Sequence, residues 1–175
     1  MIPTDNDFRI LFEEKPEEYL DIYKEEIEEF MTIDEDDDDY EPSDAEDMSA
    51  EELFEILFAT LITDDDDFCE VINVLADEYL PYDVDADFED EELVVYIDED
   101  RHVIDSQDDY GILRKFDEII KPDFETRVMK MSIDEANVHS LLILKCDEWK
   151  NLESKYGEKV SKCFEKIDNV DFISE

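Results

Sequence analysis

The sequence predicts an α+β fold in which a helical, acidic N-terminal part packs with a small, mostly antiparallel sheet and two C-terminal helices. Apolar residues recur at helical spacing through about the first 80 positions, and short segments of β type follow after residue 84. Hydrophobic residues make up 42% of the 175 positions, with only two glycines and five prolines, and this favours a folded chain over a disordered acidic one. We expect residues 1–82 to form the acidic helical part and residues 83–175 the α+β part, as two lobes or as one compact domain.

Helical spacing and helix-start signals predict an all-helical N-terminal part. Thr4, with Asp7 three residues later, resembles a helix start, and Pro16 restarts the chain for a second helix. Ser49 with Glu52 is a capping box, which opens a helix that is apolar almost all round as far as Ile62. The predicted helices cover residues 4–12, 16–31, 49–62 and 64–80.

The pattern changes after residue 84. The segment Leu93–Ile97 is rich in β-branched residues, and a turn over 98–101 leads to His102–Ile104 as its hairpin partner. A helix over 112–120 ends at Pro122, and a last long helix presents an apolar face from Trp149 to Ile167. Further strands are predicted over residues 126–131, 140–144 and 170–173.

Charge is distributed unevenly along the chain. Residues 1–100 contain 41 acidic and three basic residues, a sum of −38, whereas residues 101–175 contain 17 acidic and 12 basic residues, a sum of −5. A charge of this size lowers stability through self-repulsion, so folding alone does not explain it. It repels nucleic acid and anionic membranes and attracts basic protein surfaces, which indicates a basic protein partner.

The motifs of common enzyme classes are missing from the sequence. With Gly111 and Gly157 as its only glycines, the chain has neither GxGxxG nor GxxxxGK[ST], and it also lacks HExxH, GxSxG and CxxC. His102 and His139 are expected on strands or in a turn, and neither has another His or a Cys at a metal-ligand spacing. We therefore expect no enzymatic activity and no cofactor.

One sequence pattern resembles the motif of metal-dependent nucleases. Pro122-Asp123 followed by Glu148 and Lys150 matches a PD…ExK layout, but the ExK triplet recurs at residues 13–15 and 153–155. Lys150 is expected on a helix rather than on a strand, and a net charge of −43 would repel a DNA substrate. The nuclease interpretation is therefore disfavoured.

Runs of aspartate are candidate ligands for a calcium ion. An EF-hand loop needs alternating oxygen ligands and a glycine at its sharp turn. The runs at residues 34–39 and 64–67 are consecutive and contain no glycine. We expect no dedicated metal site.

The cysteines and the apolar stretches predict where the protein acts. Cys69, Cys146 and Cys163 are odd in number and widely spaced, which favours a reducing compartment. The first residues do not form a signal peptide, and stretches such as Leu141–Leu144 are far shorter than the about 20 residues of a membrane span. We expect a soluble protein of the cytoplasm that does not bind membranes.

A folded half with this charge can imitate a polyanion. Duplex DNA carries one negative charge per about 1.7 Å of axis, so −38 corresponds to the phosphates of roughly 19 base pairs. Residues at i and i+4 on a helix lie about 5–6 Å apart, comparable to phosphates along a strand, so four acidic residues of the helix predicted over 16–31 would form a row. The candidate partner-binding residues are this row, Glu17, Asp21, Glu25 and Glu28, and the acidic residues Asp34, Asp36, Asp37, Asp38, Asp39, Asp64, Asp65, Asp66, Asp67, Asp87, Glu89, Asp90, Glu91 and Glu92.

In composition, residues 1–100 resemble the DNA-mimic inhibitors that phages and mobile elements use against host restriction, CRISPR and other defence systems. The shared features are small size, extreme acidity, few glycines and regular helical patterning, without a motif of any particular family. The resemblance implies a non-enzymatic inhibitor that blocks a basic DNA- or RNA-binding protein, such as a defence nuclease or its complex, in the host cytoplasm. Such an inhibitor does not bind nucleic acid itself.

Other classes of protein explain the same charge. An immunity or antitoxin protein would neutralise a basic nuclease toxin, and the C-terminal part with its Trp149 helix would suit that function. An acidic chaperone of basic proteins usually carries its charge in a disordered tail, and a salt-adapted exterior would be acidic throughout, unlike residues 101–175. If the Trp149 helix left an exposed apolar patch, that patch would indicate a homodimer.

Overall fold

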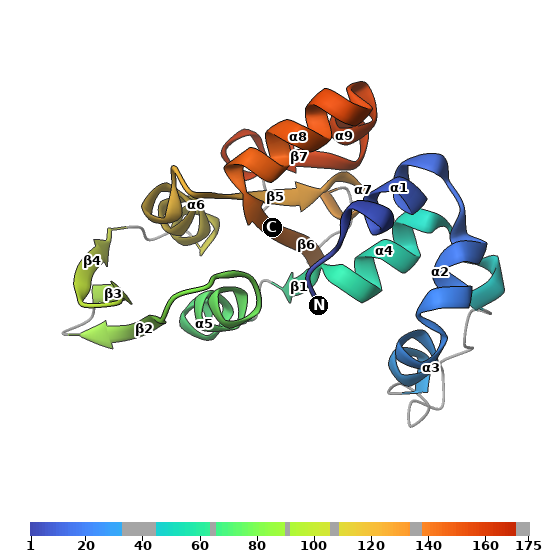
Figure 1. Ribbon diagram of the computed structural model, residues 1–175. Helices are drawn as coiled ribbons and strands as arrows, with labels where there is room; N and C mark the ends of the chain where they lie inside the picture. The colour runs from blue at the N-terminus through green and yellow to red at the C-terminus, as the bar shows by residue number, and fades with distance from the viewer. Residues whose placement is uncertain (33–44, 64–65, 90–91, 106–108, 134–137, 171–175) are drawn as a thin grey trace. The chain divides into compact units, whose positions relative to one another are not determined.

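The computed structural model describes residues 1–32, 45–63, 66–89, 92–105, 109–133 and 138–170 (Figure 1). Within these ranges the chain forms nine α-helices and two antiparallel sheets, so the fold is α+β, as predicted. Contacts divide the chain into two compact units, Met1–Ala59 and Thr60–Glu175. None of the helices in the described ranges is long and apolar enough to span a membrane.

The first unit consists of short helices. Helix α1 begins after Thr4 as predicted, because the backbone N–H and the hydroxyl of Thr4 donate to the Asp7 carboxylate at 2.7 and 2.6 Å. The same buried carboxylate accepts the hydroxyl of Tyr23 at 2.9 Å, which ties the start of α1 to the end of α2. The elements of this unit are α1 (Asp5–Glu13), α2 (Pro16–Ile22), α3 (Lys24–Thr32), the 3₁₀ helix η1 (Ala45–Asp47) and α4 (Ala50–Phe58).

Aromatic rings form the core of the first unit. The ring centroid of Phe54 on α4 lies 5.4 Å from that of Phe8 and 5.0 Å from that of Phe58. The ring of Tyr23 meets Phe58 edge-on at 5.4 Å. Aromatic pairs in such arrangements stabilise a core beyond the area that they bury, so these contacts hold α1, α2 and α4 together.

A four-stranded antiparallel sheet forms the centre of the second unit. Its strands lie in the order β1 (Thr60–Thr63), β6 (Val138–Lys145), β5 (Phe124–Met129) and β7 (Phe164–Lys166). All six residues of β5 and six of the eight residues of β6 are buried. Helices α6 (Asp109–Ile120) and α8 (Cys146–Tyr156) contact β5, and α5 (Phe68–Tyr79) contacts β6.

A smaller three-stranded sheet follows α5 in the chain. Strands β2 (Val84–Glu89), β3 (Glu92–Ile97) and β4 (Asp100–Ile104) form an antiparallel meander. The side chain of Asn73 on α5 accepts the N–H of Ala86 at 2.8 Å and donates to the carbonyl of Ala86 at 3.1 Å. This pair of hydrogen bonds fixes β2 against α5.

The C-terminal helices cover the four-stranded sheet through Trp149. Its indole N–H donates to the carbonyl of Glu125 on β5 at 2.9 Å, and Trp149, Leu152 and Val160 are buried. The predicted apolar face is therefore part of the core. Gly157, at a φ of +57°, separates two helices there. The remaining elements are α7 (Lys130–Ile133), α9 (Glu158–Cys163) and the 3₁₀ helix η2 (Ile167–Asn169).

Two helices predicted in the N-terminal part are shorter than expected. The helix predicted over 16–31 is interrupted at Tyr23, which is held outside helical geometry while its ring packs on Phe58. The helix predicted over 49–62 ends at Phe58, because Thr60–Thr63 pairs with β6 as a strand. The prediction that the first 80 residues are all helical is therefore wrong, and an apolar run of this length fits either element.

Two strands of the C-terminal part were not predicted from the sequence. The last helix ends at Cys163, and Phe164–Lys166 pairs with β5. Strand β2 was not predicted, although Asp85, Asp87 and Glu89 alternate with Val84, Ala86 and Phe88 as in a half-exposed strand. Of the strand predicted over 170–173, Val170 is not in a strand and the other residues lie outside the described ranges.

Contacts place the division of the chain earlier than the sequence suggests. The boundary between the units lies between Ala59 and Thr60 in the chain, whereas residues 60–82 were expected in the helical part. These residues form β1 and α5, which contact β6 and β2 respectively, so they belong to the second unit.

Candidate functional site

Exposed acidic side chains on α2 and α3 form the first part of the candidate surface. Glu17 and Asp21 lie on α2, and Glu25 and Glu28 lie on α3; all four are exposed. Because Tyr23 interrupts the helix, the expectation of one continuous row is wrong. Helical spacing relates Glu17 to Asp21 and Glu25 to Glu28, each pair within its own helix.

Two basic residues of the first unit lie near the junction of α1 and α2. Lys15 lies 2.7 Å from Glu13 and 3.3 Å from Glu18, and Arg9 pairs with the same two carboxylates. Hydrogen bonds from Lys15 and then Arg9 lower the pKa of Glu13, and a hydrogen bond from Arg9 lowers the pKa of Glu18. These cations therefore neutralise Glu13 and, on α2, Glu18, whereas Glu17 and Asp21 on the same helix have no such partner in the described ranges.

Little positive charge compensates the acidic residues of α2 and α3. Lys24 lies 3.6 Å from Glu28, and both side chains are largely exposed, an arrangement that contributes little to stability. Four further carboxylates have no cation within 4.0 Å among the described residues. We call these four the α2–α3 acidic patch: Glu17, Asp21, Glu25 and Glu26.

Asp66 and Asp67 combine surface charge with a local structural role. The Asp66 carboxylate accepts the N–H of Thr63 at 2.6 Å, and the Asp67 carboxylate accepts the N–H of Cys69 at 2.9 Å as the N-cap of α5. Both acidic residues are exposed. They therefore shape the connection between β1 and α5 while adding negative charge beside it.

The candidates on the three-stranded sheet differ in their partners. Glu89 accepts the hydroxyl of Tyr96 at 2.6 Å and pairs with Arg101 at 3.0 Å. The hydrogen bond from Tyr96, followed by those from Arg101, lowers the pKa of Glu89. Asp87 and Glu92 are exposed and have no cation within 4.0 Å in the described part of the chain. Of these three acidic residues, Asp87 and Glu92 are therefore available to a partner, because Glu89 is already paired with Arg101.

The remaining predicted site residues lie outside the described ranges. The placed candidates fall on α2 and α3 in the first unit, and directly before α5 and on β2 and β3 in the second. The candidates that are not described are Asp34, Asp36, Asp37, Asp38, Asp39, Asp64, Asp65, Asp90 and Glu91.

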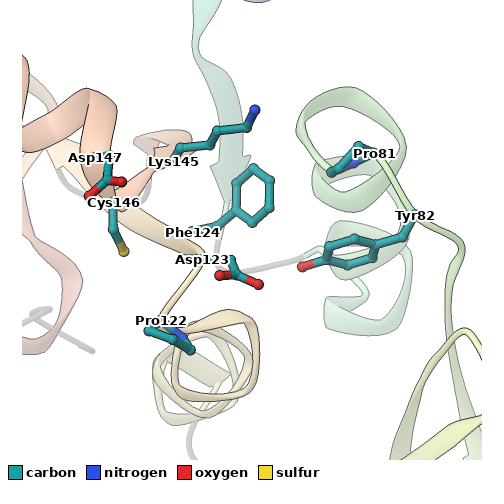
Figure 2. Close-up of a pocket in the computed structure, with 8 residues that line it drawn as sticks. All are labelled: Pro81, Tyr82, Pro122, Asp123, Phe124, Lys145, Cys146 and Asp147. Atoms are coloured by element: carbon teal, nitrogen blue, oxygen red, sulfur yellow. The ribbon is translucent and has the colours of Figure 1, made fainter.

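A cleft of about 380 Å³ in the second unit was not predicted from the sequence (Figure 2). In Figure 2 the Tyr82 hydroxyl and the Asp123 carboxylate point toward one another, and the Tyr82 ring meets Phe124 edge-on at 5.9 Å. Burial and then the charges of Asp123 and Asp98 raise the pKa of Tyr82. Three distant segments build this cleft, so no local motif could reveal it. Its lining is Pro81, Tyr82, Pro122, Asp123, Phe124, Lys145, Cys146 and Asp147.

The thiol in this cleft is poorly suited to nucleophilic chemistry. Cys146 is partly buried at the first position of α8. Burial and then the negative charge of Glu125 raise the pKa of the Cys146 thiol, which disfavours the thiolate at neutral pH.

We expect Cys146 to react with iodoacetamide more slowly at neutral pH than a thiol of the unfolded chain, because less thiolate is present. The rate should increase as the pH rises above the ordinary cysteine pKa of about 8.5. Peptide mass spectrometry gives the rate, and a Cys146→Ser variant gives the background from the buried Cys69 and Cys163. Alkylation of Cys146 at neutral pH as fast as that of an unfolded thiol would contradict the raised pKa, and faster alkylation would indicate an activated nucleophile.

His139 and the residues of the nuclease-like pattern make contacts that are typical of structural residues. His139 is buried on β6, where its Nδ1 lies 3.2 Å from the carbonyl of Ser132 and its ring meets Tyr110 edge-on. Glu148 and Lys150 lie on helix α8, as expected, and Lys150 pairs with Asp147 at 2.8 Å. In the described ranges, no group of three or more His, Cys, Asp or Glu side chains is arranged to hold a metal ion.

Comparisons with models of protein families, with curated proteins and with solved structures found no match. The charge and geometry of the described residues are therefore the basis on which a function can be proposed.

Proposed function

We propose that this protein is a non-enzymatic acidic inhibitor, which imitates the polyanionic backbone of nucleic acid and blocks a basic DNA- or RNA-binding protein. The observation that carries the proposal is the α2–α3 acidic patch, four exposed carboxylates without a cation within 4.0 Å among the described residues. The target class that fits best is a nuclease or a nuclease complex of host defence, acting in the cytoplasm.

The physical basis is competition for a groove lined with Lys and Arg. Helices hold carboxylates at fixed separations, about 5–6 Å for neighbours one turn apart. The fold therefore orders these charges before the partner binds. Uncompensated charge of one sign steers a basic partner and can raise the rate of association about 10- to 1000-fold. Screening by salt weakens such binding, since the Debye length is about 8 Å at physiological ionic strength.

The placing of the basic residues supports this proposal. Arg9 and Lys15 bind Glu13 and Glu18 at the junction of α1 and α2, and they leave the neighbouring patch unneutralised. A surface that served solubility alone would not require such a separation of charges. All three cysteines are free thiols, which is compatible with a reducing cytoplasm as the place of action.

The proposal is tested by capture followed by competition. The immobilised protein should retain a nucleic-acid-binding protein from a host lysate at low salt, and the purified captured protein should then lose a fluorescent duplex of about 20 base pairs when the inhibitor is added. Free poly-glutamate of equal total charge serves as the control and should compete less well, because its charges are not held on a fold.

Two results would contradict the proposal. Either no nucleic-acid-binding protein is retained, or the captured protein keeps its duplex at saturating inhibitor. If the captured protein is a nuclease that is inhibited while its DNA remains bound, the immunity-protein interpretation replaces polyanion mimicry.

A further inference from the structure

A groove of about 190 Å³ lies between strand β1 and helix α5 in the second unit. Its apolar lining includes Leu61 on β1 and Val71 and Val74 on α5, three residues apart and therefore on one side of that helix. Leu61 is 43% exposed and Val74 is 52% exposed. Two partly exposed apolar side chains therefore lie beside one depression that is rimmed by polar residues.

The rim of this groove is acidic. Asp66, Asp67 and Glu70 line it, all three are exposed, and none has a cation within 4.0 Å among the described residues. Asp66 and Asp67 are also held in place by their hydrogen bonds to the N–H groups of Thr63 and Cys69. The charges of the rim are therefore fixed beside the apolar lining.

We infer that this groove binds one large apolar side chain of the basic partner, flanked in the partner's sequence by Lys or Arg. The inference rests on the proposed function and adds a second contact to it. The groove is smaller than the about 300–1,000 Å³ of typical small-molecule pockets, so it fits a single side chain better than a whole ligand. Charge complementarity selects the flanking residues, since the rim presents three carboxylates.

The groove and the acidic patch would influence different steps of binding. Long-range charge mainly accelerates encounter, whereas an apolar anchor that loses its water slows dissociation. The α2–α3 acidic patch would thus set the association rate, and the β1–α5 groove would set the lifetime of the complex and its selectivity among basic proteins.

The probe is a pair of labelled peptides of equal charge, Lys-Arg-Leu-Arg-Lys and Lys-Arg-Ala-Arg-Lys. Fluorescence anisotropy at about 0.15 M salt, where the Debye length is about 8 Å, should show about tenfold tighter binding of the leucine peptide. Val74→Gln should abolish this difference while leaving the weak binding of the alanine peptide unchanged. Val103→Gln, at a valine that is 44% exposed on β4 outside the groove, should preserve the difference.

Melting curves of the two variants verify that each remains folded. Equal affinity of the two peptides for the original protein would overturn the inference. The inference would also be overturned if Val103→Gln removed the difference in affinity between the peptides as fully as Val74→Gln. The test is separate from that of the proposed function. If duplex competition succeeds while the peptides bind equally, only the groove is refuted; if the leucine peptide is preferred while competition fails, only polyanion mimicry is refuted.

Discussion

Replacing the four carboxylates of the α2–α3 acidic patch with amides should slow association with a captured basic target by about 10- to 100-fold at low salt, because long-range steering is lost. The free energy of unfolding should stay the same or rise slightly, since like charges on one surface repel one another. Stopped-flow association at two salt concentrations measures the first effect, and urea unfolding measures the second. At high salt the rates of the variant and the original protein should converge.

The matched control removes the same amount of charge elsewhere. Asp77, Asp105, Asp123 and Glu158 are exposed acidic residues of the second unit outside the candidate surface. Their amide variant should associate nearly as fast as the original protein. Equal slowing of both variants would mean that net charge, and not its location, governs association, and it would remove the α2–α3 acidic patch from the interface.

Arg127→Ala should destabilise the second unit by about 1–3 kcal/mol, the cost of leaving a buried polar group without one of its hydrogen-bond partners. The Arg127 side chain is 5% exposed, lies 2.7 Å from both Glu125 and Glu153, and stacks over the Trp149 ring at 4.2 Å. Its removal would leave Glu125 buried with Lys166, 2.8 Å away, as its remaining cation in the described part of the chain.

Urea unfolding followed by circular dichroism and by the fluorescence of Trp149, the single tryptophan, measures this effect. The control is Arg101→Ala: that arginine pairs with Glu89 at 3.0 Å, but its side chain is 43% exposed, so a much smaller change is expected. Similar losses from the two variants would show that the network around Arg127 is not desolvated in solution.

The same network gives the second unit a defined acid sensitivity. Burial acts to raise the pKa of Glu125, but hydrogen bonds from Lys166 and Arg127 outweigh it and hold that pKa below its ordinary value. A carboxylate with a lowered pKa stabilises the fold above the ordinary glutamate pKa of about 4.3, and this contribution is lost as the pH falls through the lowered value. Arg127→Ala should therefore weaken the second unit most at neutral pH and least in strong acid.

Local signals allowed much of the fold to be predicted from sequence. The Thr4–Asp7 and Ser49–Glu52 pairs each cap the helix that they were expected to start, and Pro122 follows the end of α6. Strands β1 and β7 could not be predicted in this way, since each depends on pairing with a strand distant in the chain. In β1, the apolar pattern of the preceding helix continues into the strand, so the end of α4 is not visible in the sequence.

The sequence shows the excess of acidic residues in the candidate surface, but it does not show which of these carboxylates have no cation nearby. Composition shows an excess of carboxylates, whereas their neutralisation depends on distances such as that between Lys15 and Glu13. Glu26 was not a candidate and belongs to the acidic patch, while Glu89 was a candidate and is paired with Arg101. The β1–α5 groove and the cleft at Cys146 each join segments whose proximity arises on folding.

The side-chain amide of Asn73 covers part of the free edge of β2. Strands at the border of a sheet present backbone N–H and C=O groups on which another chain can assemble as an additional strand. At Ala86 both groups are already bonded to the Asn73 amide, which takes the place of a neighbouring peptide unit. We therefore expect α5 to hinder a second molecule from pairing with β2 at this position, and repulsion between acidic chains acts in the same direction.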